Sequence, residues 1–188
     1  ILVPMFGKVV AHARRLCCAD RASLFFCDWE GRRLWSAVAE GVTTKASTGE
    51  GPRGKLVSSI FNHKDSSIII EVPMGRGVVG RVADTAKSIR TSNARSLPYF
   101  DDTHDLKTGY RTKSILCVPV KVPGHKNDSV VAVLMLINKL QADTASASGR
   151  NRDDTKRSDT HGEGATFDEH DLALAERLAA QVSGPVAH

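Results

Sequence analysis

Residues 112–140, TKSILCVPVKVPGHKNDSVVAVLMLINKL, determine the fold more than any other part of this sequence. They predict two long strands, 112–122 and 129–140, because each is a run of apolar and β-branched side chains. The residues between them, 123–128, include Gly, Asn and Asp, which favour a turn. Pro119 has no N–H, so one side of the first strand should be locally unpaired. The stretch therefore predicts an antiparallel pair of strands.

The sequence upstream predicts three more strands. Residues 21–28 and 33–39 are two short apolar runs separated by a turn at 29–31, which is typical of a hairpin. A further run, 67–73, is rich in β-branched residues.

Apolar residues at helical spacing predict a helix near each end of the chain, at 5–18 and 167–183. Shorter helical segments are expected at 77–87 and 94–104. Strands joined by tight turns favour antiparallel pairing, and the terminal helices would cover one face of the sheet. The predicted class is therefore α+β.

Length and charge limit the function classes. The 188 residues suit one domain, 1–188, interrupted by polar insertions at about 42–66 and 141–165, the second of which should be disordered. The 26 basic and 21 acidic residues give a net charge of +5. No run of like charges concentrates the basic excess, so we expect no nucleic-acid partner. No apolar run is long enough for a membrane span.

The four cysteines form no CxxC pair and lie in apolar stretches, which favours free, buried thiols in a reducing compartment such as the cytoplasm. The chain does not start with Met and shows no signal-peptide pattern, so we expect a domain of a longer cytoplasmic protein.

Three motifs have simpler explanations than catalysis. The run from Gly75 to Gly80 matches GxGxxG, but the acidic strand end that a dinucleotide fold needs is missing. Its helix start would still favour an anion. The pairs His104-Asp105 and His170-Asp171 lack the further ligands of a metal site. We therefore expect no catalytic residues, no metal and no cofactor.

The last helix should begin with a capping box formed by Thr166 and Glu169. Upstream, Asn138-Lys139 ends the last strand. We expect Lys139 to pair with Asp168 and to fix the helix to the sheet.

Together these segments resemble a GAF domain of the type found in cyclic-nucleotide phosphodiesterases and adenylyl cyclases. The resemblance is carried by ADRASLFFCD (19–28), SAVAEG (36–41), VPMGRGVVGRVADT (72–85), DLKTGYRTKSILCVPV (105–120), VLMLINK (133–139) and FDEHDLALAERLAAQV (167–182). It implies a six-stranded antiparallel sheet with the terminal helices on one face. Short helices and loops would cover a ligand pocket on the other face.

The resemblance also implies site residues. By position, the ligand-binding residues would be Ser23, Glu40, Val78, Val79, Asp105, Thr108 and Thr112. The first two would face the purine, the backbone of the next two would meet the cyclic phosphate, and the last three would close over the ligand. The family's Asn-Lys…Asp-Glu signature, which holds the pocket shut, would comprise Asn138, Lys139, Phe167, Asp168 and Glu169.

Three departures from the family pattern are expected to affect binding. The signature's Phe, four residues before the Asp, falls on Gly164. An aromatic residue of some members is Ala39, and a polar one is Met135. Each lost polar contact with a buried ligand costs about 1–3 kcal/mol.

The resemblance implies a regulatory domain that binds cAMP, in preference to cGMP, and controls a catalytic domain outside this chain. That partner would be a phosphodiesterase, and the polar insertions favour a protozoan, kinetoplastid-like parent. Two alternatives stay open. One is a degenerate GAF domain that dimerises through the stripes of its terminal helices, and the other is a sensor of a different metabolite.

Overall fold

The fold is described by a computed structural model that covers residues 2–40, 70–122, 129–141 and 165–186. The two expected insertions and the turn between the last two strands lie outside the described residues, except at their ends. No helix in these ranges has the length and apolar character needed to cross a membrane.

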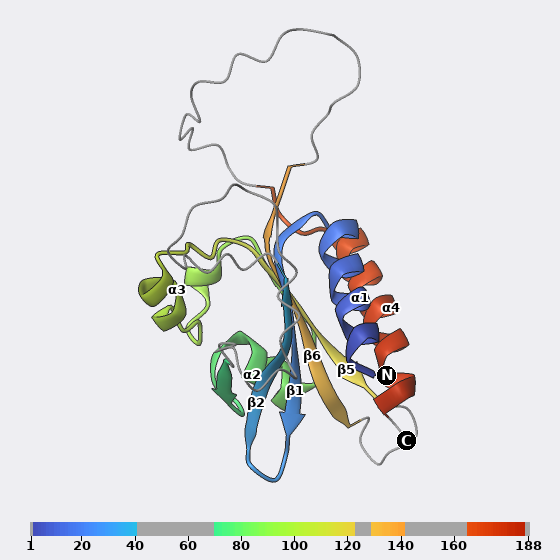
Figure 1. The fold of residues 1–188 in the computed structure, drawn as a ribbon. Helices are drawn as coiled ribbons and strands as arrows, with labels where there is room; N and C mark the ends of the chain where they lie inside the picture. The colour runs from blue at the N-terminus through green and yellow to red at the C-terminus, as the bar shows by residue number, and fades with distance from the viewer. Residues whose placement is uncertain (1, 41–69, 123–128, 142–164, 187–188) are drawn as a thin grey trace, which may run out of the picture.

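Six strands form one antiparallel sheet in the order β3-β2-β1-β6-β5-β4 (Figure 1). The strands are β1 (Ala19–Asp28), β2 (Arg33–Glu40), β3 (Glu71–Pro73), β4 (Ile89–Thr91), β5 (Ile115–Lys121) and β6 (Val130–Lys139). This confirms the expected α+β class and the six-stranded sheet. Sequence periodicity did not identify β4, because three residues are too short to show alternation.

The helices divide between the two faces of the sheet (Figure 1). Helices α1 (Leu2–Leu16) and α4 (Glu169–Val186) lie side by side on one face. Helix α2 (Gly77–Thr85), the 3₁₀ turn η1 (Ala94–Ser96) and α3 (Thr103–Thr108) belong to the other side. The sheet therefore separates a layer of two long helices from a layer of shorter helical segments.

Alternation along β6 explains why there are two cores. Leu134 and Leu136 belong to the buried cluster under α1 and α4. Val133 and Met135 point the opposite way, into the cluster under α2. Successive side chains of a strand face opposite sides, so a continuous apolar run serves a sheet that is covered on both faces.

Most of the described apolar side chains on the stripes of the terminal helices are buried within this chain, although Leu16 is 54% exposed. Val10 and Ala13 of α1 and Ala175 of α4 are completely buried against the sheet. The dimerisation hypothesis needs these stripes to pair with a second copy, but their buried residues already pack against the sheet. A homodimer stays a prediction, and it would have to use other faces of the helices.

Pro119 lies where the sequence analysis expected it. It pairs with Val133 of β6, while on the other side of β5 the strand β4 reaches only Cys117. Pro119 therefore lies beyond the end of β4. At this position, on that side of β5, the described structure has no neighbouring strand whose hydrogen bonds a proline would interrupt.

The GxGxxG run is a tight packing feature. Gly75 has φ of +79°, and the N–H of Gly75 donates to the carbonyl oxygen of Gly80 at 3.2 Å. A Cβ added to Gly80 would lie 2.7 Å from the carbonyl oxygen of Pro73. The glycines thus allow α2 to approach the turn after β3, without any need for a dinucleotide.

We predict that Gly80→Ala lowers the free energy of unfolding by about 1–3 kcal/mol, because backbone must move to admit the methyl group. Gly7→Ala is the matched control, since a Cβ at Gly7 meets nothing within 4 Å. In a helix interior this change should stabilise the chain by up to about 1 kcal/mol. Urea denaturation measures both, and equal effects of the two variants would contradict the packing role of Gly80.

Candidate functional site

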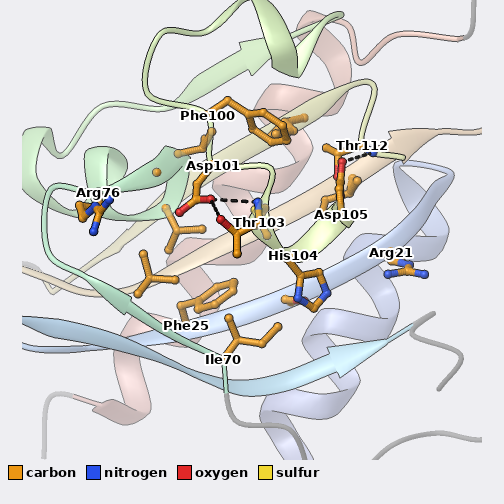
Figure 2. A pocket seen from close by; sticks show the side chains of 18 of the residues that line it. Arg21, Phe25, Ile70, Arg76, Phe100, Asp101, Thr103, His104, Asp105 and Thr112 are labelled. Atoms are coloured by element: carbon orange, nitrogen blue, oxygen red, sulfur yellow. Dashed lines mark hydrogen bonds between the residues drawn. The ribbon is translucent and has the colours of Figure 1, made fainter. Parts of the chain in front are cut away.

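A cavity of about 350 Å³ lies on the α2 and α3 side of the sheet (Figure 2). Its apolar wall is made by Phe25 of β1, Ile115 of β5 and Met135 of β6. Polar and charged side chains line the rest, among them Arg21, Ser23, Glu71, Arg76, Asp101, His104, Asp105, Tyr110 and Thr112. Such a site suits a small ligand that has one apolar, flat part and several polar groups.

The start of α2 gives the cavity an end that favours an anion. Val78 and Val79 line the cavity and lie in the first turn of the helix. Backbone N–H groups in a first turn have no partner within the helix and carry the positive end of its dipole. The N-cap residue, Arg76, adds a positive charge and makes no side-chain cap. A phosphate would be stabilised here.

The opposite part of the cavity is held by Asp105 of α3. Its buried carboxylate accepts hydrogen bonds from the Thr112 N–H at 2.8 Å and the Thr112 hydroxyl at 2.7 Å (Figure 2). Arg95 approaches the same carboxylate at 3.4 Å. These contacts tie α3 to the chain entering β5, so two expected ligand-binding residues lie together and orient one another.

The other expected ligand-binding residues differ in their positions. Ser23 is buried and lines the cavity. Thr108 is exposed outside the lining, and its hydroxyl donates to the carbonyl oxygen of His104 at 2.8 Å. The backbone of Glu40 pairs with Ala22, but its side chain, like that of Ala39, lies outside the described residues.

Sequence reasoning missed Arg21 and Tyr110. The Arg21 Nε atom is buried and has no hydrogen-bond partner in the described structure. The guanidinium carbon lies 3.3 Å from the centroid of the Tyr110 ring. A signal was available, because Arg21 is two residues from Ser23 and therefore faces the same side of β1.

The sequence predicted an ion pair between Lys139 and Asp168, and this prediction is wrong. The Lys139 ammonium group contacts both carboxylate oxygens of Asp171, at 2.7 and 2.8 Å. Asp171 is buried, with 4% of its side chain exposed, and Lys139 is 18% exposed. The Lys–Asp pair that joins β6 to α4 therefore exists, but its acid is one helical turn further along the chain.

Asp168 instead caps the N-terminus of α4. Its carboxylate accepts from the N–H of Asp171 at 2.8 Å, while the N–H of Asp168 donates to the Asp171 carboxylate at 2.9 Å. These two bonds form a capping box, so the expected box between Thr166 and Glu169 is wrong. The Asp171 N–H, and with it the charge of Lys139, lowers the pKa of Asp168. Glu169 instead forms an ion pair with Arg90.

The corrected acid also changes the position of the signature aromatic residue. Counting back four residues from Asp171 gives Phe167, whereas Gly164 lies outside the described residues. Phe167 is buried, and the Lys139 ammonium lies 5.9 Å from the centroid of its ring. The departure assigned to Gly164 therefore came from counting back from the wrong acid.

Asn138 connects the end of β6 to the segment between α3 and β5. Its side-chain oxygen accepts from the Lys113 N–H at 2.7 Å, and its amide nitrogen donates to the Tyr110 hydroxyl and to the Arg111 carbonyl, both at 2.9 Å. Asn138 has φ of +56°, a conformation that Asn tolerates better than most residues. The Asn and Lys of the signature thus hold opposite sides of the sheet.

No group of three or more His, Cys, Asp or Glu side chains within the described ranges is arranged to hold a metal ion. The acids of the two His-Asp pairs have structural partners, since Asp105 bonds to Thr112 and Asp171 to Lys139.

Comparison with known proteins places these features in context. The profile of the GAF domain family matches residues 2–184. The chain is 32% identical over 132 residues to a probable 3′,5′-cyclic phosphodiesterase, pde-5, of Caenorhabditis elegans, covering 70% of this chain and 16% of the relative. It is 31% identical over 146 residues to dual 3′,5′-cyclic-AMP and -GMP phosphodiesterase 11A of Takifugu rubripes, covering 73% and 14%. The matched part of the chain thus spans only 14–16% of the length of these relatives.

Among solved structures, the fold is similar to that of the GAF domain of a phosphoenolpyruvate-protein phosphotransferase from Coxiella burnetii. The TM-score is 0.65 and the identity 18%, covering 100% of this chain and 83% of the other. At this identity the likeness concerns the fold alone.

We predict that Asp171→Asn lowers the free energy of unfolding by about 2–3 kcal/mol, because it leaves the Lys139 charge without its partner. Asp168→Asn is the matched control, since Asn is as good an N-cap as Asp and should leave the urea midpoint nearly unchanged. A larger loss for Asp168→Asn than for Asp171→Asn would contradict the assignment of the pair.

Proposed function

The chain belongs to the GAF domain family, and we propose that it is a regulatory domain that binds a cyclic nucleotide and controls a catalytic domain of the same protein. Both curated relatives named above are cyclic-nucleotide phosphodiesterases, which supports a phosphodiesterase as the parent protein. The domain itself would be a sensor without catalytic residues. A cytoplasmic location fits this role and stays a prediction.

The cavity is the observation that carries the proposal. It combines an anion-favouring end at Val78 and Val79 with an apolar wall at Phe25, and the hydrogen-bonded pair of Asp105 and Thr112 lines another part of it. A cyclic nucleotide has one negative phosphate, a ribose and a flat purine. In the proposed complex the phosphate lies at the start of α2, and the purine lies along the apolar wall near Ser23.

Regulation would follow if the bound ligand stabilised α3 in one position. The ligand would contact Asp105 and Thr112, which already tie α3 to the start of β5. A ligand that binds this arrangement better than an open one shifts the population toward it. We favour cAMP over cGMP, a preference that comes from the sequence analysis.

Isothermal titration calorimetry with cAMP and cGMP tests the ligand class. We expect saturable binding of at least one nucleotide, with cAMP the tighter. Binding should also raise the melting temperature, because the ligand stabilises only the folded chain. The proposed function is ruled out if millimolar nucleotide produces no binding heat and no shift of the melting temperature.

Two threonine variants test the site. We predict that Thr112→Val weakens nucleotide binding about tenfold, because the hydroxyl no longer orients the Asp105 carboxylate. Thr108→Val removes the same group from an exposed residue outside the cavity and should change the affinity less than twofold. The proposed placement fails if the Thr108 variant has the larger effect.

A further inference from the structure

Tyr110 makes contacts in three directions at the point where α3 leads into β5. It lies directly after Gly109, the C-cap of α3, which has φ of +68°. Its ring lines the cavity and lies against the Arg21 guanidinium. A change in the position of α3 at the cavity must therefore move the Tyr110 ring or strain the short connection.

The Tyr110 hydroxyl uses both its proton and a lone pair. It donates to the Asp20 carboxylate at 2.7 Å and accepts from the Asn138 amide at 2.9 Å. Burial and the Asp20 hydrogen bond raise the pKa of Tyr110, so the phenol keeps the proton that it donates. The Tyr110 hydroxyl is thus held in place by hydrogen bonds to two different strands, to Asp20 of β1 and Asn138 of β6.

Asp20 is directly connected to α1. Its carbonyl oxygen accepts from the Arg14 Nε atom at 2.8 Å, and Arg14 lies in the last turn of α1. The carbonyl oxygen of Cys18, between α1 and β1, accepts from the Leu140 N–H at 2.7 Å. The connection between α1 and β1 is therefore held from one side by Tyr110 and from the other by the end of β6.

We infer that Tyr110 is a positioning residue that couples the α3 side of the cavity to α1 on the opposite face of the sheet. The route runs from the cavity through the Tyr110 hydroxyl to Asp20 and on to Arg14. It is separate from the Lys139–Asp171 pair, which holds α4. The inference rests on the proposed function only for the identity of the ligand that moves α3.

Hydrogen–deuterium exchange of peptides covering residues 10–20 tests the coupling. Tyr110→Phe keeps the ring and removes the hydroxyl, so exchange in the free chain should become about fivefold faster. Tyr99→Phe is the matched control. It changes the other tyrosine of the chain, whose ring lies 5.7 Å from Arg81 outside the cavity lining, and exchange at 10–20 should stay unchanged.

A double-mutant cycle separates coupling from a general loss of stability. Thr112→Val loosens α3 and should speed exchange at 10–20 about threefold in an otherwise natural chain. In the Tyr110→Phe background it should cause no further increase, because the connection is already broken. Urea denaturation of all four proteins shows whether global stability accounts for the changes. Additive effects, or no effect of Tyr110→Phe, would overturn the inference.

Saturating cAMP provides the ligand arm. It should slow exchange at 10–20 at least about twofold in the natural chain, since it holds α3 in place. At cAMP concentrations that saturate each protein, Tyr110→Phe should lose this slowing. If the slowing survives in the variant, the inference fails. If cAMP does not bind at all, the proposed ligand fails, and the double-mutant cycle still decides the coupling.

Discussion

The ion pair between Lys139 and Asp171 is the interaction on which the arrangement of this domain depends. It joins the last residue of β6 to the first turn of α4, 32 positions along the chain. Because the acid is buried and also completes the helix cap through Asp168, the start of α4 has one favourable position. With α4 and α1 on one face of the sheet, the opposite face is left for the cavity.

The residue before Lys139 connects that cavity to the same strand end. Asn138 bonds to the segment between α3 and β5, so the two faces of the sheet are held by neighbouring residues of one strand. The cavity between α2 and α3 has an anion-favouring end and a carboxylate that is already held by Thr112. A ligand that fills the cavity would therefore contact side chains that are already oriented. We infer that a change in α3 would reach α1 through Tyr110 and Asp20.

The sequence was sufficient for the long elements and for the family, and insufficient where partners are chosen in space. Strands such as β6 have enough alternating apolar side chains to be recognised, whereas β4 has three residues. The partner of Lys139 was misassigned because Asp168 and Asp171 are one helical turn apart, and only the packed helix shows which carboxylate faces the sheet. The spacing of Arg21 from Ser23 places both on one face of β1, but no sequence pattern shows that the Arg21 Nε atom would be buried as an unpaired donor.

We propose that the cavity between α2 and α3 binds a cyclic nucleotide with its phosphate at the start of α2. A crystal structure of the chain grown with cAMP tests this most directly. We expect the phosphate oxygens to lie within hydrogen-bond distance of the backbone N–H groups of Val78 and Val79, and the purine to lie in the cavity. An empty cavity, or a nucleotide bound elsewhere on the chain, would contradict it.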